Sequence, residues 1–269
     1  MNPLTAGSSN AASNILGSLG NNSSLITSIQ TQLSTNQKIL DPAQQGVVTR
    51  LNSQVASFNA AHNNINKAQN VLSVASTGLK SIASLITQMQ ELANKANSPT
   101  MTDDDRTKLN DTFTGLLTQL SNTAENTLID GSGLLGASAT DLSIQTGLDT
   151  TDATVIHAHS ADATSLSIDG SDISSVSGAA SAISALKSAL SSVSAYQSGV
   201  AADQVSLSSK DTLNSSISSN LQNTIDSIQK PDAAQLQMDL QNANNQQSMN
   251  YYLINQMNQE AQSVLTIFR

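Results

Sequence analysis

Few side chains in this 269-residue chain have the type and spacing to do chemistry, and two histidines are the first candidates. His157 and His159 lie two residues apart, so on a strand both would point to the same face, and Asp162 follows closely. Such a group could hold a metal ion. A solvent-exposed pair of strands explains the same spacing without a metal, and we favour that interpretation.

The other candidates have structural explanations. Asp103, Asp104 and Asp105 lack the alternating oxygen ligands and the closing Glu of a calcium loop, so we interpret them as the start of a helix. His62 falls in an apolar row and is expected to be a packed or partly exposed core histidine, not a catalytic base. The chain has no cysteine and no nucleophile-elbow, P-loop, HExxH or dinucleotide-binding fingerprint. We therefore expect no catalytic residue, no cofactor and no metal, and a protein that is not an enzyme.

Composition narrows the class further. Ser, Thr, Asn and Gln supply 116 residues, whereas aromatic residues are only 2%, which argues against a thick globular core. The net charge is −9 without any basic run, so nucleic acid is not an expected partner. No stretch approaches the roughly 20 apolar residues of a membrane span, and the first 20 residues lack the features of a cleaved signal peptide. We expect no membrane insertion.

Helical periodicity dominates the sequence. Apolar residues recur in steps of three and four from Leu51 to Ala93, which predicts one long coiled-coil-like helix over 45–96, about 75 Å in length. Residues 98–100 end it, and Thr102 is expected to cap a second helix, with Asp105 three residues later. The same rhythm returns over 183–228, is broken at Pro231, and continues over 236–268.

Between residues 141 and 172 the period changes to two. Leu142 and Ile144, Val155 and His157, and Leu166 and Ile168 alternate with other residues, which predicts short strands in one or two hairpins. The expected fold class is mainly α: an elongated rod of long, coiled-coil-like antiparallel helices with a small β-hairpin region, the N- and C-terminal helices being paired. The expected segments are an N-terminal assembly helix (1–40), the first part of the rod with two long helices (41–140), the β-hairpin region (141–175), a returning rod helix (176–230) and a C-terminal assembly helix (231–269).

Both chain ends are amphipathic helices that cannot bury their apolar rows alone, because isolated helices gain most of their stability from packing. We expect the two ends to pair with each other and with copies from neighbouring molecules. The predicted assembly interface comprises Leu25, Ile26, Ile29, Leu33, Leu236, Leu240, Ile254, Met257, Val264, Leu265 and Phe268.

Several segments resemble bacterial flagellin. Residues 51–69 look like its first long helix, 89–98 are similar to the end of that helix, and 103–109 and 142–147 are also flagellin-like. Residues 213–221 resemble its returning helix, and the ending over 258–269 is close to the flagellin C-terminus. The resemblance covers about residues 33–147 and 180–269. Only some 30 strand-like residues separate the rod helices, so the resemblance implies a short form without the family's variable outer domains.

The resemblance implies a structural subunit that self-assembles into the bacterial flagellar filament used for motility. It also implies a secreted, extracellular protein that leaves the cell through the flagellar type III export apparatus without a cleaved signal peptide. The implied partners are copies of the chain itself, an export chaperone, and the hook-associated and cap proteins. Two alternatives stay open at this point: a hook–filament junction protein and a flagellin-like cell-surface binding protein.

Overall fold

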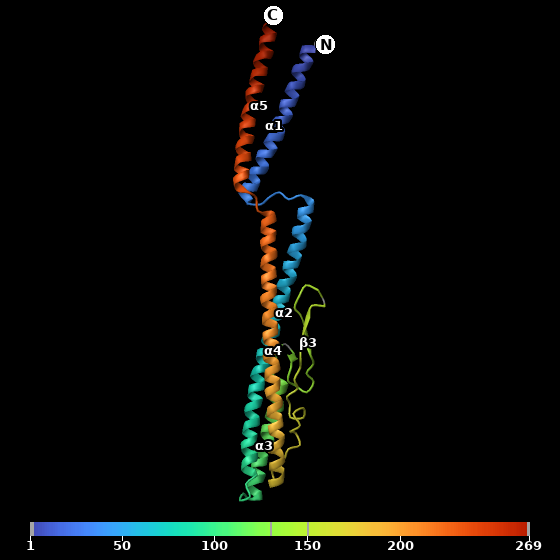
Figure 1. Ribbon diagram of the computed structural model, residues 1–269, viewed down its shortest axis with the longest axis vertical. Coiled ribbons are helices and arrows are strands. Elements are labelled where there is room, and N and C mark those ends of the chain that lie inside the picture. Colours follow the sequence, from blue (N-terminus) through green and yellow to red (C-terminus); the bar gives the residue numbers. More distant parts are fainter. Residues whose placement is uncertain (1–2, 130, 150, 268–269) are drawn as a thin grey trace. The chain divides into compact units, whose positions relative to one another are not determined.

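The computed structural model describes residues 3–129, 131–149 and 151–267, and the side chains discussed below are those of residues 10–263 and 266 within these ranges. In chain order the elements are α1 (Pro3–Thr35), α2 (Pro42–Ala96), α3 (Asp103–Asn126), β1 (Leu128–Ile129), β2 (Ser132–Gly133), β3 (Leu142–Gln145), β4 (Ala153–Ile156), α4 (Val176–Gln229) and α5 (Ala233–Ile267) (Figure 1). Among the described residues, no helix carries a stretch long and apolar enough to cross a membrane.

The chain packs as two compact units. We call the one formed by Met1–Asn52 and Gln222–Arg269 the terminal unit, and the one formed by Ser53–Leu221 the central unit. Within the terminal unit, α1 and α5 lie side by side (Figure 1). The expected mainly α fold, with long helices, paired terminal helices and a small β region, is confirmed.

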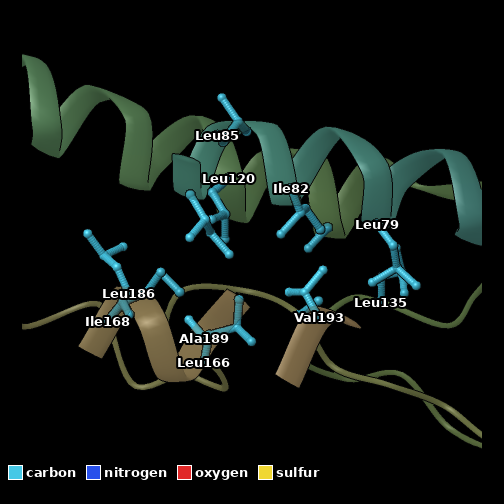
Figure 2. Packing of buried hydrophobic residues seen from close by; sticks show 14 of the residues in the cluster. Leu79, Ile82, Leu85, Leu120, Leu135, Leu166, Ile168, Leu186, Ala189 and Val193 are labelled. Atoms are coloured by element: carbon cyan, nitrogen blue, oxygen red, sulfur yellow. The ribbon is translucent and has the colours of Figure 1, made fainter. Parts of the chain in front are cut away.

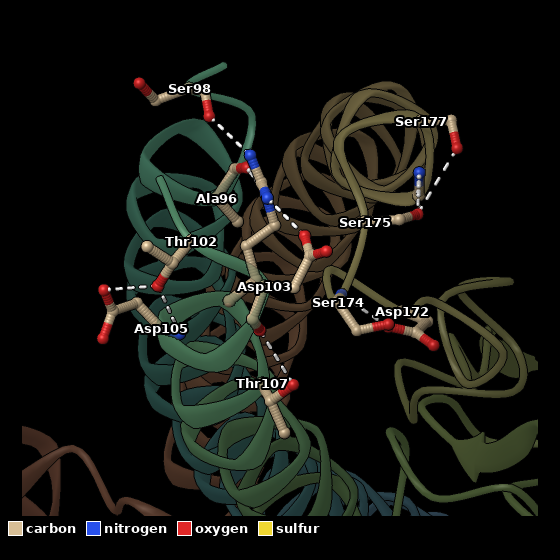
Figure 3. A network of polar contacts seen from close by, with 12 residues as sticks. Ala96, Ser98, Thr102, Asp103, Asp105, Thr107, Asp172, Ser174, Ser175 and Ser177 are labelled. Carbon is tan, nitrogen blue, oxygen red and sulfur yellow. Dashed lines mark hydrogen bonds and ion pairs between the residues drawn. The ribbon is translucent and has the colours of Figure 1, made fainter. Parts of the chain in front are cut away.

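Short polar side chains begin the helices. At the start of α2, Asp41 Oδ1 accepts from the Gln44 N–H at 2.8 Å, and Pro42 fills the first helical position, where its missing N–H costs nothing. Thr102 caps α3 as expected: its Oγ1 accepts from the Asp105 N–H at 3.3 Å and donates to Asp105 Oδ2 at 2.7 Å (Figure 3). These hydrogen bonds lower the pKa of Asp105, the Thr102 hydroxyl being the main cause.

Pro231 separates the last two helices, as the sequence indicated. Helix α4 ends at Gln229, and Asp232 Oδ1 accepts from the backbone N–H groups of Ala234 and Gln235 at 3.0 and 3.1 Å to start α5. Proline lacks the N–H that would continue a helix, so the chain can restart there in a new direction. Near this break the Lys38 N–H donates to the Gln229 carbonyl at 2.7 Å, which ties the α1–α2 connection to the end of α4.

The hydrophobic core belongs to the central unit. Side chains from α2, α3 and α4 meet there, and Figure 2 shows Leu79 and Ile82 facing Val193 across the packed layer. The loop between α3 and α4 adds Leu135, Leu166 and Ile168, so one flank of the helices is covered by irregular chain. The largest fully buried side chains include Phe113, Ile65, Leu72, Leu79, Ile82, Ile86, Met89 and Leu120.

Two short antiparallel pairs make up the β structure. β1 pairs with β2, and β3 pairs with β4 in the register Leu142↔Ile156 to Gln145↔Ala153. Amides from the long helices hold the β3–β4 hairpin: Asn214 Nδ2 donates to the Thr146 carbonyl at 2.7 Å, and Asn64 Nδ2 donates to the Gln145 carbonyl at 3.4 Å. Asn214 is buried, so this bond is shielded from water.

The predicted strand at Leu166 and Ile168 is wrong. Asp162 Oδ2 accepts from the N–H groups of Thr164 and Ser165, and its carbonyl accepts from the Leu166 N–H, which winds the chain into turns. The alternation arises because Leu166 and Ile168 both dip into the core, at 6% and 0% exposure, from a turn instead of a strand.

A buried arginine closes the end of α2. The Arg106 guanidinium is 4% exposed; Nε donates to the Ala96 carbonyl at 2.9 Å and Nη2 to the Ser98 carbonyl at 2.7 Å. Nη1 lies 2.7 Å from Asp103 Oδ1. Figure 3 shows Ala96, Ser98 and Asp103 converging on this group. A cation at a helix C-terminus stabilises the unpaired carbonyls there, so Arg106 joins α3 to the end of α2.

Gly78, in the middle of α2, is required by close packing. A Cβ at this position would lie 2.5 Å from Thr127 Cγ2 and 2.9 Å from Leu135 Cδ1. Thr127 cannot easily move, because its Oγ1 donates to the Thr123 carbonyl. Gly115, in α3, offers the matched contrast, since a Cβ there would meet nothing within 4 Å.

We therefore predict opposite effects of alanine at these two glycines. Gly115→Ala should raise the free energy of unfolding by up to about 1 kcal/mol, because alanine favours helix. Gly78→Ala should lower it by about 1–2 kcal/mol, because the overpacking outweighs the same helix preference. Denaturant unfolding followed by circular dichroism measures both. Equal stabilisation by the two substitutions would contradict the close contact at Gly78.

Candidate assembly surface

The terminal unit is built on the antiparallel pair of α1 and α5. Asn22 Nδ2 donates to the Ala243 carbonyl at 2.7 Å, and Asn250 Nδ2 donates to Ser18 Oγ at 3.4 Å. As residue numbers fall along α1 they rise along α5, so the two helices run in opposite directions (Figure 1). Asn22 is 6% exposed, and the hydrogen bond from its side-chain amide to the Ala243 carbonyl fixes the alignment of the pair.

This unit buries little apolar surface within the chain. Of the described residues, every member of the hydrophobic core cluster lies in the central unit. Among the described side chains, the terminal unit contributes five buried hydrophobic residues: Ile29, Val48, Leu51, Ile225 and Ala243. Of these, one, Ile29, comes from α1 and one, Ala243, from α5. A helix with one partner can cover one row of side chains, and the rest of its apolar surface stays in water.

Large apolar side chains are instead exposed on the terminal unit. On α1 and α5 they include Leu16 at 60%, Met249 at 60% and Tyr252 at 68% exposure. Among the side chains that the structure describes, those exposed in this unit are Leu16, Leu25, Ile39, Val47, Met238, Met249, Tyr251, Tyr252 and Leu253. Helix α1 carries no charged residue and α5 carries only Asp239 and Glu260. Exposed apolar surface of this kind, without charge, is typical of a surface that packs against another chain.

The predicted interface residues fall into three groups. Ile29 is buried, and Ile26, Leu33, Leu236, Leu240, Ile254 and Met257 are half-buried; Leu25 is exposed. Val264 and Leu265 lie in α5 at positions whose side chains are outside the described set, and Phe268 is outside the described residues. Most of the predicted residues therefore lie where α1 and α5 partly cover each other within one chain.

On α1 and α5, the described exposed apolar residues outside the predicted set are Leu16, Met238, Met249, Tyr251, Tyr252 and Leu253. They lie off the three-and-four rhythm, so a search for one apolar row does not select them. Their signal in the sequence is an apolar side chain at a position where the helical pattern requires a polar one.

A groove runs along one flank of the pair. It has a volume of about 510 Å³ and is lined by Ser13, Asn14, Gly17, Ser18, Asn21, Asn22, Leu25 and Gln246. Its walls are small or uncharged, and a Cβ on Gly17 would meet nothing within 4 Å. Asn22 Oδ1 is buried and accepts no hydrogen bond.

The histidines singled out by the sequence all lie in the central unit and do different things. His157 Nδ1 lies 3.0 Å from Asp141 Oδ2, while Asp141 Oδ1 accepts from the Ala158 N–H at 2.8 Å. The Ala158 N–H first and then His157 lower the pKa of Asp141. His62 Nδ1 lies 2.5 Å from Asp211 Oδ1. Within the described part of the chain, no three His, Cys, Asp or Glu side chains come together as metal ligands would.

His159 packs flat against α4. Its ring stacks on Tyr196 with centroids 4.8 Å apart, and a Cβ on Gly199 would lie 2.9 Å from His159 Nε2. Burial lowers the pKa of His159, and His157 acts in the same direction. The charges of Asp203 and Asp141 oppose this shift. The backbone N–H of His159 also donates to the Leu134 carbonyl at 2.7 Å, so this residue holds the segment after β4 onto the core.

A mainly helical chain with paired terminal helices that carry few charges, and with a separately packed central unit, belongs to the class of proteins built from long helices. Comparison with known proteins gives the family. Residues 8–140 match the bacterial flagellin N-terminal helical region. The flagellins of Listeria innocua serovar 6a and Listeria monocytogenes serovar 1/2a are each 28% identical over 138 residues, which are 50% of this chain and 48% of theirs.

The fold agrees with these matches. The crystal structure of Bacillus cereus flagellin matches with a TM-score of 0.51 at 20% sequence identity, over 56% of this chain and 88% of that one. The chain belongs to the bacterial flagellin family. It spans about half the length of the curated relatives that it matches.

The His159 contact predicts a pH dependence of stability. Because its pKa lies below the ordinary value of 6.5 in the folded chain, the unfolded chain binds the proton more tightly. The free energy of unfolding should therefore be highest above about pH 6.5, the ordinary pKa of histidine, and should fall as the pH is lowered from about 7 towards 5. Denaturant unfolding at several pH values measures this slope.

His159→Gln should flatten the slope in that window. His157→Gln leaves the burial of His159 in place and removes only the smaller contribution of His157, so it should flatten the slope much less. An unchanged slope in the His159 variant would contradict the assignment.

Proposed function

We propose that this protein is a structural subunit that assembles with copies of itself into the flagellar filament and so serves motility. The observation that carries this proposal is the contrast between the two units: the central unit has its own core, whereas among the described side chains the terminal unit buries five hydrophobic residues and exposes nine large apolar ones. Family membership supports the same role. The protein acts by burying helical surface between subunits and has no catalytic function.

The energetics favour assembly through the terminal helices. Helices α1 and α5 have 33 and 35 residues, and each has one helical partner in the chain. Burial of a large apolar side chain stabilises by about 1.5–3 kcal/mol, and helical stability in water comes mostly from such packing. Additional helices from neighbouring copies would cover the flanks that the pair leaves open. Because α1 is uncharged, close approach of copies there brings no like-charge repulsion.

The remaining parts of the proposal follow from the family. A secreted filament subunit would be exported through the flagellar type III apparatus with the help of an export chaperone, without a cleaved signal peptide. It would sit in the filament between the hook-associated proteins and the cap proteins. A hook–filament junction protein or a surface binding protein would be found at a different location on the cell. Antibody labelling along the whole filament would support a filament subunit. Labelling only at the filament base or on the cell surface would contradict that role.

Removal of the last 20 residues tests assembly directly. We expect the chain ending at residue 249 to form no filaments, because it loses the segment of α5 that includes Tyr251, Tyr252 and Leu253. The central unit, which has its own core, should keep its helical circular dichroism and its cooperative unfolding. Electron microscopy and sedimentation of concentrated protein compare it with the full chain.

The control is Val205→Ser, which removes an exposed apolar side chain from α4 in the central unit and should leave assembly unchanged. Filaments of normal appearance from the shortened chain would refute the proposed role of the terminal helices.

A further inference from the structure

Methionine is the most readily oxidised residue of this chain. The sequence contains six methionines but no cysteine and no tryptophan, so the thioether is its only sulfur group. A thioether reacts with peroxides to give a sulfoxide, which turns a flexible apolar side chain into a polar one. Oxidation depends on whether the oxidant can reach the sulfur atom. The exposure of each methionine therefore decides where the chain reacts.

The methionines that the structure describes differ widely in exposure. Met89 lies in the core of the central unit and is 0% exposed. Met238 and Met249, both on α5, are 53% and 60% exposed. The half-buried ones are Met101 and Met257. Among the described side chains, the two methionines that are most open to an oxidant therefore belong to the proposed assembly surface.

Met249 belongs to a group of exposed apolar side chains. Tyr252 and Leu253 follow it by three and four residues, and both are exposed. Residues at these spacings are neighbours on the surface of a helix. Helical side chains also lean towards the N-terminus, so Tyr252 and Leu253 lean towards Met249. If this part of α5 is covered by another copy of the chain, the three side chains are buried together.

Met238 offers a matched contrast on the same helix. It lies eleven residues before Met249, which is three turns and about 20°, so both methionines lie on one face of α5. The neighbours of Met238 at the same spacings are Gln241 and Asn242, and both are exposed. Their amide groups are hydrogen-bond donors for a sulfoxide oxygen. A sulfoxide at Met238 would therefore disturb its surroundings less than one at Met249.

We propose that Met249 is an oxidation site through which peroxides inhibit assembly of the chain. This inference rests on the proposed self-assembly and adds a chemical regulation to the same surface. The sulfoxide places a hydrogen-bond acceptor beside Tyr252 and Leu253. Burying that acceptor between copies without a donor opposes assembly, because an unpaired buried polar group costs free energy.

The reaction needs only a peroxide as co-reactant. The sulfur lone pair attacks one oxygen of hydrogen peroxide, so that an S–O bond forms and the O–O bond breaks. The departing hydroxide takes the proton of the transferred hydroxyl group and leaves as water. Sulfur loses two electrons, and the peroxide is reduced by the same two. A methionine sulfoxide reductase with a thiol reductant reverses the change.

The site of oxidation is tested on the dilute, unassembled chain. Mild treatment with hydrogen peroxide, followed by mass spectrometry of peptides, measures the rate at each methionine. We expect Met238 and Met249 to react at rates within about threefold of each other and at least about tenfold faster than Met89. Circular dichroism should be unchanged, because both reactive side chains are exposed. Oxidation of Met249 at no more than the rate of Met89 would contradict the proposal.

The effect on assembly is measured by sedimentation and electron microscopy of treated and untreated protein. Treatment should raise the concentration needed for assembly by about tenfold or more for the natural chain and for Met238→Leu. Met249→Leu keeps an apolar side chain of similar size without sulfur, so its value should change by less than about twofold. Equal inhibition of Met249→Leu and the natural chain would overturn the proposal, as would normal assembly of the oxidised natural chain.

Met249→Gln gives a measurement without any oxidant. It places a polar side chain of similar length at this position and should raise the concentration needed for assembly by about tenfold, whereas Met238→Gln should raise it by less than about threefold. Equal effects of the two substitutions would count against the special position of Met249.

Reduction of the oxidised chain completes the test. A methionine sulfoxide reductase with dithiothreitol should restore assembly, and no recovery after Met249 has been fully reduced would refute the inference. An untreated natural chain that stays monomeric at every concentration would instead refute the proposed self-assembly itself. The two failures are therefore distinguishable.

Discussion

The number of partners that each helix meets governs how this chain divides into a stable unit and an incomplete one. In the central unit α2 buries neighbouring rows of side chains, such as Val71 with Leu72 and Leu85 with Ile86, because the core brings together α2, α3, α4 and the loop before α4. In the terminal unit α1 has only α5, and Ile29 is its one buried large apolar side chain among those described. Similar periodic sequences therefore give a packed core in one place and open surface in the other.

Buried polar groups set the alignment of these helices. With aromatic residues at 2%, few large side chains are available to specify one packing over its shifted neighbours. Asn22 aligns α5 on α1, Asn214 holds the β3–β4 hairpin on α4, and Arg106 joins α3 to the end of α2. If its element slid by one turn, each of these polar groups would lose its hydrogen bond while it remained buried away from water. The apolar rows alone would allow several registers, and this cost favours one of them.

Much of this fold could be predicted from the sequence, because its main signals are local. The three-and-four rhythm over α2, the cap at Thr102 and the break at Pro231 each depend on a few neighbouring residues, and the structure confirms all three. Leu166 and Ile168 were misinterpreted, since alternation cannot distinguish a strand from a turn in which two side chains dip into the core. The turn conformation of this segment is set by Asp162, whose side chain accepts hydrogen bonds from the backbone N–H groups that follow it.

The assembly surface was harder to predict for the opposite reason. Periodicity selects residues such as Ile29 and Leu240, which face the partner within the chain. Exposed residues of the proposed assembly surface, such as Met249 and Tyr252, lie outside that row. Arg106 also escaped notice, because the carbonyls that it binds become neighbours only when α3 folds back on α2. These features depend on three-dimensional neighbours and carry no period of their own.

The distribution of charge also favours the proposed assembly through the terminal unit. That unit has four basic and five acidic residues, so eight of the nine net negative charges belong to the central unit. Repulsion between copies therefore acts mainly on the central unit, where a net charge favours solubility and opposes non-specific association. The uncharged α1 can approach a neighbour without that repulsion. The proposed association through the terminal helices is therefore opposed less by charge than an association through the central unit would be.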